Sequence, residues 1–572
     1  MRNIFTYKHV LLCLLSLIMQ IELTEAQWSN DASQNNCVTN ALKDQKRNCI
    51  ANDGLNNFII GWRNLEFTSN TMIGGKIYAQ KFNAEGVVQW TENGILVNYS
   101  SVDDGHDAPQ IIKSENGKVI FVWLKWGSGF TSPAHLYARK IGENGTGLWN
   151  SDVKLFNRSG GQGVHCTSPD NSNGIIVSCS YANGYWATTE KDIIAQRINY
   201  AGEIKWGTEG IDVCTATGSQ LYARTAVNSK GETFITWRDS RTDPNGDIYA
   251  QKIDSSGTIK WETNGIAICN NLNGQEYPVL ITDNNNGIIV AWIDKDSDFN
   301  MGIRVQRIDQ DGYPLWTSNG VLVCNNTYFY PPSIVSDGAG GAIICWPDTR
   351  GADNDIYAQH INADGLIQWA AGGVPVSTAS GNQRDPLAIS DGEGGIIITW
   401  SDFRNDPNYN DIYAQRLNHA GTSLWQTNGV PVSTASGLQL NPSLTTDGNG
   451  GAVIAWDDNR NGTANCDIYI QKIDKNGNLG GVSNLTQPDT EVSPPVSIFP
   501  NPVKDNLCLK LNDTNSNRVV IRIFSVDGTL IREISTSDNK LLKLPASDLK
   551  KGIYILSIKG TGINYMIKIV KK

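Results

Sequence analysis

The sequence predicts an all-β protein whose larger part is a ring of repeated four-stranded sheets. One pattern recurs eight times along most of the 572-residue chain. Each copy contains short runs of β-branched and aromatic residues bounded by Gly, Asn and Asp turns, which is typical of strands joined by tight hairpins. The chain also has 56 Gly and 17 Trp but only 18% charged residues, a composition that suits many turns between short strands.

Two markers locate each copy of the repeat. The expected second strand carries Trp in seven copies and Cys in one, at intervals of 54 to 61 residues: Trp62, Trp123, Cys179, Trp237, Trp292, Trp346, Trp400 and Trp456. The expected third strand recurs as variants of Ile-Tyr-Ala-Gln, which begin at Ile77, Leu136, Ile193, Ile248, Ile303, Ile356, Ile412 and Ile468. These intervals leave room for four strands and their turns in each copy.

A single four-stranded sheet cannot bury both of its faces. Copies arranged around an axis cover the faces of their neighbours, so the repeats predict an eight-bladed β-propeller with four-stranded blades over residues 27–479. A linear β-solenoid is the alternative, although its coils are shorter than these units.

The two ends of the repeat array predict that the ring is closed by the N-terminal segment. The last copy has Gly481 where the others have a Trp on the fourth strand. Trp28 and Cys37 are nine residues apart, close to the eight that separate Trp206 from Cys214. We therefore expect the segment 27–37 to pair with the last sheet, which would remove an exposed sheet edge.

The segments outside the repeats predict export. Residues 1–26 contain Arg2 and Lys8, an apolar run over 10–21 and then Ala26, as in a secretory signal peptide. That run is too short to span a bilayer as a helix, so we expect no transmembrane segment in the mature chain. Residues 480–495 are polar and contain Pro, which indicates a linker. The net charge of −10 argues against a nucleic-acid partner.

Residues 496–572 alternate apolar and polar side chains as the strands of a small Ig-like β-sandwich do. Several short motifs occur there in order, ahead of a basic end: Phe499, Pro500, Asn501 and Pro502, then Asp527 and Gly528, then Gly552 and Tyr554. With these motifs the region resembles the type A C-terminal sorting domain of the type IX secretion system of Bacteroidota. The resemblance implies the type IX machinery as a partner, and a location in the medium or on the outer-membrane surface.

A Trp-x-Asp-x-Arg motif follows the second strand in four repeats. Its members are Asp239 with Arg241, Asp348 with Arg350, Asp402 with Arg404, and Asp458 with Arg460. These charges could ring one mouth of the axial channel and bind a glycan or a peptide through bidentate Arg bonds and Asp acceptors. Alternatively, each pair could fasten its own hairpin, a structural role copied from repeat to repeat.

Function is better sought where the repeats differ. The connections between repeats carry Gln at one position, with His106 and Phe329 in its place in two copies, and we expect these Gln residues to satisfy buried backbone groups. Repeats two and three instead carry aromatic insertions, so Trp126, Phe130, Tyr185 and Trp186 are candidate ligand-binding residues.

Export permits disulfides. Cys166 and Cys179 flank one predicted hairpin and form the first candidate pair. Cys37 and Cys49, on either side of the predicted closure, form the second.

No catalytic constellation is evident in the sequence. It contains no HExxH, GxSxG, P-loop or CxxC motif, so no metal, cofactor or catalytic residue is assigned. The sequence favours an exported module that binds a glycan or a protein. A glycoside hydrolase or polysaccharide lyase with its site at the propeller mouth is the enzymatic alternative, and a spacer or interaction platform in a surface layer is a third possibility.

Overall fold

The computed structural model describes residues 28–68, 71–99, 105–126, 133–184, 190–298, 300–462, 465–480, 496–499, 506–511, 519–525, 529–536, 542–560 and 563–571. The chain divides into two compact units, Met1–Ser483 and Asn484–Lys572. All regular secondary structure in the described ranges is β-strand, so these ranges contain no helix that could cross a membrane. The predicted signal peptide and residues 481–495 of the predicted linker lie outside the described residues.

The described part of the first unit forms eight four-stranded antiparallel sheets, which we call repeats 1 to 8. Repeats 1 and 2 comprise β2 (Gln45–Asn52), β3 (Phe58–Thr68), β4 (Thr71–Phe82) and β5 (Ile95–Leu96), then β6 (Gly105–Lys113), β7 (Val119–Trp126), β8 (His135–Ile141) and β9 (Val153–Lys154). Repeats 3 and 4 comprise β10 (Gly161–Pro169), β11 (Ile175–Ala182), β12 (Asp192–Ile198) and β13 (Ile211–Cys214), then β14 (Gln220–Val227), β15 (Thr233–Asp239), β16 (Asp247–Ile253) and β17 (Ile266–Cys269).

Repeats 5 and 6 comprise β18 (Gln275–Thr282), β19 (Ile288–Lys295), β20 (Met301–Ile308) and β21 (Val321–Cys324), then β22 (Ser333–Ser336), β23 (Ala342–Asp348), β24 (Asp355–Ile361) and β25 (Val374–Ser377). Repeats 7 and 8 comprise β26 (Gln383–Ser390), β27 (Ile396–Asp402), β28 (Asp411–Leu417) and β29 (Val430–Ser433), then β30 (Gln439–Thr446), β31 (Ala452–Asp458), β32 (Asp467–Ile473) and the N-terminal β1 (Asn36–Thr39).

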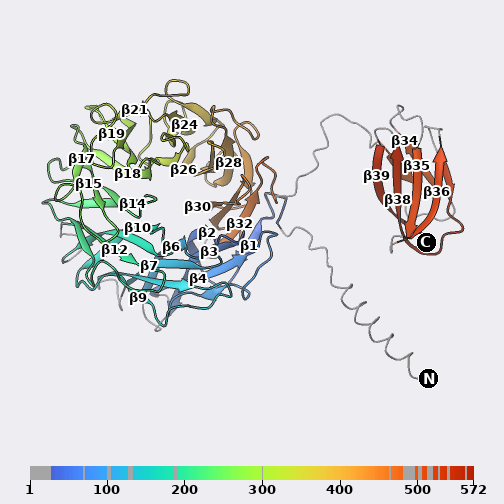
Figure 1. Ribbon diagram of the computed structural model, residues 1–572, viewed down its shortest axis with the longest axis horizontal. Helices are drawn as coiled ribbons and strands as arrows, with labels where there is room; N and C mark the ends of the chain where they lie inside the picture. Colours follow the sequence, from blue (N-terminus) through green and yellow to red (C-terminus); the bar gives the residue numbers. More distant parts are fainter. Residues whose placement is uncertain are drawn as a thin grey trace. The chain divides into compact units, whose positions relative to one another are not determined.

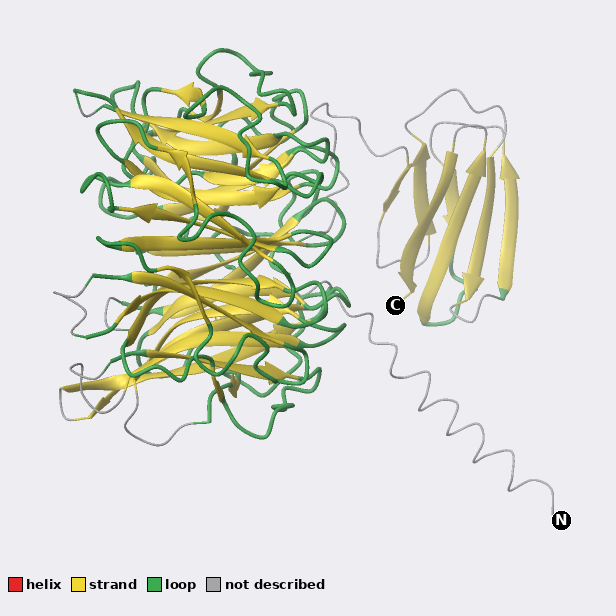
Figure 2. Ribbon diagram, turned by 60° about the vertical axis from the view of Figure 1, so that its left-hand side comes forward, coloured by secondary structure: helices red, strands yellow, loops and turns green. Residues whose placement is uncertain are grey.

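The repeats surround a common centre, with the first strand of each repeat innermost (Figure 1). Each innermost strand contacts the next, and β2 of repeat 1 contacts β30 of repeat 8. Loops gather at the two ends of the sheets (Figure 2). The predicted all-β, β-propeller-like organisation of this unit is therefore confirmed.

The N-terminal strand completes the last sheet, as the sequence predicted. β1 runs antiparallel to β32, with Cys37 opposite Tyr469. The strand begins only at Asn36, near the end of the predicted segment. Trp28 is buried, stacks on Phe82 at 6.0 Å between ring centroids, and donates from its indole Nε1 to the Ala84 carbonyl of repeat 1 at 2.8 Å.

The same indole bond joins every pair of neighbouring repeats. A Trp near the fourth strand of one repeat donates to a backbone carbonyl in the turn between strands three and four of the next. The eight bonds are Trp28 to Ala84, Trp90 to Glu143, Trp149 to Tyr200, Trp206 to Ser255, Trp261 to Gln310, Trp316 to Ala363, Trp369 to His419 and Trp425 to Lys475. The first of them links repeat 8 to repeat 1 and so closes the ring.

The hydrogen bonds of the Gln that ends the third-strand motif explain why this residue recurs. In repeat 7, Gln415 donates through Nε2 to the Gln426 carbonyl at 2.8 Å. Its Oε1 accepts from the backbone N–H of Arg416 at 2.9 Å and of Trp425 at 3.1 Å. One buried amide thus satisfies three backbone groups and positions the outer Trp.

The second unit contains two antiparallel sheets in its described residues. One is formed by β33 (Val496–Phe499), β34 (Asn506–Leu511) and β37 (Leu542–Pro545); the other by β36 (Leu530–Thr536), β35 (Val519–Ser525), β38 (Gly552–Gly560) and β39 (Ile563–Lys571). Leu507 and Leu544 of the first sheet share a buried cluster with Ile521, Leu556 and Ile569 of the second. The unit is therefore a two-layered structure with its own core.

We expect Trp28→Ala to destabilise the first unit by about 4 kcal/mol, because it removes a buried aromatic side chain and the bond that closes the ring. Trp28→Phe keeps most of the packing and loses only the indole donor, so it should cost about 1 kcal/mol. Urea unfolding followed by tryptophan fluorescence measures both. Equal unfolding midpoints for Trp28→Ala and the wild type would contradict the proposed closure.

Candidate functional site

Seven of the eight innermost strands are interrupted by a bulge next to the centre of the ring. In β26, Arg384 pairs with Ser401 and Leu387 with Thr399, so two residues on the inner strand oppose one on its partner. Equivalent irregularities occur in β2, β6, β10, β14, β18 and β30. The bulges lie near the start of each innermost strand, close to the end of the ring that carries the loops between strands two and three. Bulges redirect side chains and are common near functional sites.

The backbone is strained at six of these bulges. Six residues that are not glycine have φ between 49° and 62° at the same place in their repeats: Arg47, Ala108, Tyr222, Tyr277, Asp385 and Asn441. Such a conformation costs on the order of 1 kcal/mol or more for each residue. None of the six is Gly, although Gly would adopt this conformation without strain. The presence of a side chain at each of these six positions, where Gly would be unstrained, is therefore notable.

Repeat 6 lacks this bulge, and its structure corrects the predicted alignment of the connection that leads into it. Thr327, not Phe329, occupies the Gln position, because Thr327 bridges Asp348 as Gln383 bridges Asp402. The segment Tyr328–Pro332 then makes a longer excursion before β22 begins at Ser333. The other predicted Gln residues do satisfy backbone groups; Gln439, for example, donates to the carbonyl of Ala435 at 3.1 Å.

We call the equivalent inner residues the bulge ring: Arg47, Ala108, Val164, Tyr222, Tyr277, the segment Tyr328–Pro332, Asp385 and Asn441. Its chemistry is asymmetric. Repeats 7, 8 and 1 contribute a polar arc of Asp385, Asn441 and Arg47. Repeats 4, 5 and 6 contribute an aromatic arc of Tyr222, Tyr277, Phe329 and Tyr330, in which Tyr277 lies 4.8 Å from Tyr222 and 5.0 Å from Phe329 between ring centroids.

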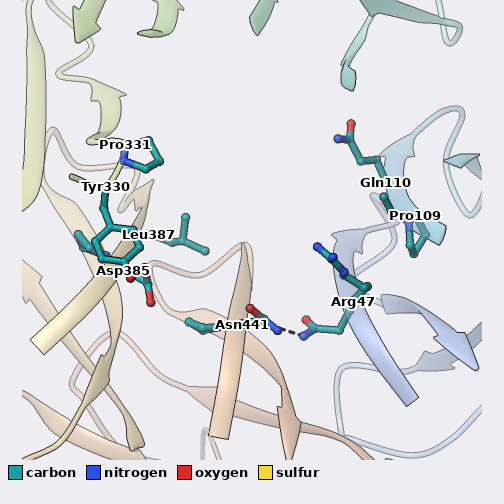
Figure 3. Close-up of a pocket in the computed structure, with 12 residues that line it drawn as sticks. Arg47, Pro109, Gln110, Tyr330, Pro331, Asp385, Leu387 and Asn441 are labelled. Carbon is teal, nitrogen blue, oxygen red and sulfur yellow. Dashed lines mark hydrogen bonds between the residues drawn. The ribbon is translucent and has the colours of Figure 1, made fainter. Parts of the chain in front are cut away.

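Part of the bulge ring lines a pocket of about 430 Å³. The pocket is lined by Arg47, Asn48, Ala108, Pro109, Gln110, Tyr330, Pro331, Asp385, Pro386, Leu387, Asn441 and Pro442. In Figure 3, Tyr330, Pro331, Asp385 and Leu387 lie on one side of the opening and Arg47, Pro109 and Gln110 on the other, with Asn441 between them. The pocket thus combines apolar walls with a few polar groups, as small-molecule sites do.

A buried carboxylate holds two members of the polar arc, Arg47 and Asn441. Asp457, with 1% of its surface exposed, accepts from the backbone N–H of Arg47 at 3.1 Å and from the side-chain amides of Asn48 at 2.8 Å and Asn441 at 2.9 Å. Burial raises the pKa of the Asp457 carboxyl, and these hydrogen bonds oppose the rise. The corresponding position of the next sheet is Arg63, so this carboxylate is specific to the junction of repeats 8 and 1.

Each of the four Asp residues ends a second strand and bonds to the Arg that lies two residues later in the same repeat. Asp402 is fully buried and accepts from the Trp400 indole at 2.7 Å, and from Nε and Nη2 of Arg404 at 2.9 and 2.6 Å. The Arg404 guanidinium lies 3.8 Å from the centre of the Tyr413 ring and donates to the Asn428 carbonyl. The pairs at Asp239, Asp348 and Asp458 repeat the Trp–Asp–Arg–Tyr contacts.

A second pocket, of about 720 Å³, lies between the loops of repeats 7 and 8. It is lined in part by Tyr409, Asp411, Leu438 and Arg460. The Arg460 guanidinium already contacts Asp458, Asn35 and Ser433. The cation that lines this pocket is therefore already bonded.

Of the four predicted aromatic site residues, the structure describes only Trp126. It ends β7, is half-buried, and packs against the apolar cluster between repeats 2 and 3 together with Ala108. Phe130, Tyr185 and Trp186 lie outside the described residues. In the described ranges, no group of three or more His, Cys, Asp or Glu side chains is placed to hold a metal ion.

The structure differs from both disulfide predictions, because Cys166, Cys179, Cys37 and Cys49 are free thiols. Cys166 pairs with Ser178 and not with Cys179, so the two cysteines point to opposite faces of their sheet. Cys37 belongs to repeat 8, whereas Cys49 packs into the cluster between repeats 1 and 2.

Among the predicted sorting-motif residues, Phe499 lies on β33, and Gly552 and Tyr554 lie on β38. Tyr554 is buried and its hydroxyl donates to the Lys550 carbonyl at 2.8 Å. Pro500, Asn501, Pro502, Asp527 and Gly528 fall outside the described residues.

Residues 497–572 match the family described as "Secretion system C-terminal sorting domain". This match confirms the predicted type IX sorting domain, which implies interaction with the secretion machinery. The protein is therefore secreted or attached to the cell surface. No curated protein gives a significant match.

Solved structures resemble the chain only weakly. They include polysaccharide lyase Uly1 (8% identity, 76% of this chain, 100% of that chain, TM-score 0.41). The β-propeller domain of the Trilobed protease from Pyrococcus furiosus gives 9% identity, 63% and 92% coverage, and a TM-score of 0.37. A protein of unknown function from Dyadobacter fermentans DSM 18053 gives 10% identity, 57% and 97% coverage, and a TM-score of 0.34. These values are too low to indicate a function.

Sequence reasoning missed the bulge ring, although a signal was present. The two residues after each Gln differ among repeats while a Pro often follows them, as in Gln383-Arg-Asp-Pro386 and Gln439-Leu-Asn-Pro442. Residues that differ among repeats at one position of an otherwise repeated motif are candidates for a functional role.

We expect Asp402→Asn to destabilise the first unit by about 3 kcal/mol, because it leaves the Arg404 guanidinium without its carboxylate in a buried setting. The exposed Asp364→Asn is the matched control and should change stability by less than about 0.5 kcal/mol. Denaturant unfolding of both variants measures the difference. Similar midpoints for the two would mean that the Asp–Arg pair does not fasten its hairpin.

Burial and the neighbouring Asp402 raise the pKa of the Asp411 carboxyl to about 6, while the Asn405 amide opposes the rise. The folded state therefore holds this proton more tightly than the unfolded chain, in which the pKa of Asp is about 3.9. The stabilisation is complete below about pH 4 and is lost as the pH rises through 6. Asp411→Asn should match the wild type in melting temperature at pH 4 and exceed it at pH 7.5; an equal difference at both pH values would refute this.

Proposed function

We propose that the protein is an exported binding module whose glycan or protein ligand binds at the bulge ring. The observation that carries the proposal is the presence of strained, chemically different residues at equivalent positions of the bulge ring, of which Arg47, Ala108, Asp385 and Asn441 line one pocket. Gly at these positions would relieve the strain, yet none of the six residues is Gly. Strain of this kind is typical of sites where side-chain direction matters.

We further propose the finer architecture in which this site is presented. Residues 27–479 form an eight-bladed β-propeller, supported by eight sheets and eight indole bonds that close on Trp28. Residues 1–26 are a signal peptide, 480–495 a linker, and 496–572 an Ig-like sorting domain. In this arrangement the sorting domain directs export of the propeller, and the propeller binds the ligand.

The Asp–Arg pairs and the aromatic residues predicted from sequence take second place in this proposal. The four Asp side chains are fully buried and each Arg side chain is bonded to its own Asp, which supports the fastening role. Trp126 is partly packed into a core cluster, which supports a structural role as well.

The test uses the full exported chain and a panel of extracellular polysaccharides and surface proteins. Tyr277→Ala and Asn441→Ala should each weaken the binding found for the wild type by about tenfold, corresponding to about 1.4 kcal/mol. Tyr313→Ala is the matched control, since Tyr313 is 69% exposed in the turn between β20 and β21, at the other end of the sheets. Biolayer interferometry measures the affinities.

Binding that survives both bulge-ring substitutions would overturn the proposed site. Release of reducing ends from a bound polysaccharide, abolished by Asp385→Asn, would make the same pocket an enzymatic site.

A further inference from the structure

We infer that the bulge ring recognises an acidic saccharide, with Arg47 as the anchor for its carboxylate or sulfate ester. This inference rests on the proposed function and specifies its ligand. The sugar ring would lie against the aromatic arc, and its hydroxyl groups would face Asp385 and Asn441.

Arg47 is the cation among the residues that line the pocket at the bulge ring. Its side chain is 61% exposed, and its nearest carboxylate is Asp107, 3.9 Å from Nε. Asp107 is already paired with Arg63 at 2.8 Å, so it satisfies little of the Arg47 guanidinium. Most N–H donors of the Arg47 guanidinium are therefore available, and this planar group can bind a carboxylate or sulfate through bidentate hydrogen bonds.

The backbone of Arg47 is fixed although its side chain is exposed. Its φ is 62°, and its N–H donates to the buried Asp457 carboxylate. Asp457 also accepts from the side-chain amides of Asn48 and Asn441, so one carboxylate fixes both the backbone of Arg47 and these two neighbouring side chains. An exposed cation whose backbone is held in a strained conformation suits a ligand-binding role better than a role in solubility.

The opposite wall of the pocket limits where a negative charge can bind. Asp385 lies across the opening from Arg47 (Figure 3), and it is the acidic residue among those lining the pocket. It would repel an anion on its side and accept hydrogen bonds from hydroxyl groups. A ligand with one anionic group and several hydroxyls fits both walls, whereas a polyanion with closely spaced charges would place one against Asp385.

The aromatic arc favours a saccharide over a flexible peptide. Tyr330, Pro331 and Leu387 form the apolar wall of the pocket. In the same ring, Tyr277 contacts Tyr222 at a tilt and Phe329 edge to face, so aromatic side chains extend from Tyr330 through repeats 5 and 4. The C–H face of a pyranose ring can pack on such a surface while its hydroxyls reach the polar arc. Amphipathic aromatic side chains provide this combination of apolar contact and hydrogen bonding.

The experiment measures binding of the full exported chain to three matched oligosaccharide sets. Two are acidic, namely uronic-acid oligomers and sulfate esters of uncharged oligomers; the third, neutral set is the uronic-acid oligomers with reduced carboxyl groups. We expect the wild type to bind at least one acidic set at least tenfold more tightly than the carboxyl-reduced set. Arg47→Gln should remove that difference, and Arg47→Lys should restore part of it, because Lys keeps the charge without the planar fork. Raising the salt concentration should weaken acidic binding in the wild type and in Arg47→Lys more than in Arg47→Gln.

Lys205→Gln is the control for net charge, since it removes an exposed cation from a turn at the other end of the sheets. It should leave all affinities unchanged, and circular dichroism should show the Arg47 variants folded. The preferred acidic set identifies the anion as a carboxylate or a sulfate. Equal binding of acidic and neutral sets, unaffected by Arg47→Gln but lost in Tyr277→Ala, would overturn this inference and leave the proposed function standing. Binding unaffected by both substitutions would overturn both.

Discussion

The ring depends on one hydrogen bond between each pair of neighbouring repeats, accepted by a backbone carbonyl in the outer turn of the second repeat. In repeat 8 the Lys475 carbonyl accepts from the Trp425 indole at 3.0 Å and from the Arg416 guanidinium at 3.2 Å, both supplied by repeat 7. The Arg416 side chain is in turn paired with the buried Asp391. One acceptor thus joins two sheets through an aromatic and a charged donor. The carbonyl is a main-chain group, so the contact leaves the side chain of the receiving residue free to vary.

This constraint explains where the repeats are alike and where they differ. The Trp, the third-strand Gln and the turn Asp are all committed to joining or shaping neighbouring sheets, so they recur in most copies. At the inner bulges the strand pairs with its neighbour through the main chain on both sides of the irregularity, so the side chain at the bulge can differ from repeat to repeat. Arg47, Tyr277 and Asp385 share this backbone position and nothing in their chemistry. The rigid outer contacts are what can support strained backbone at the inner positions.

Sequence periodicity predicted the repeats and their closure well, because both follow from local signals. Trp28 stands at nearly the same distance before Cys37 as Trp206 before Cys214, and both indoles donate to the following repeat. Phe329 was misplaced because its repeat contains a longer excursion, which shifts the register without breaking the interval between tryptophans. The disulfides failed for a related reason: a one-residue offset between Cys166 and Cys179 moves the thiols to opposite faces, and spacing alone does not reveal that offset.

The sequence by itself determined the all-β class, the repeat interval, the pairing of the first strand with the last sheet and the route of export. Each of these depends on residues close together in the chain or on motifs copied at a fixed distance. Only the tertiary structure decided that each Arg of the Asp–Arg pairs bonds to the Asp of its own hairpin. It also decided that Arg47, Asp385 and Asn441 line one pocket with Tyr330 of the aromatic arc. Those residues come from separate repeats, and the side-chain direction at each bulge is set by a positive φ that arises from the pairing of strands. Convergence of this kind is a property of the closed ring, so no local pattern in the sequence could display it.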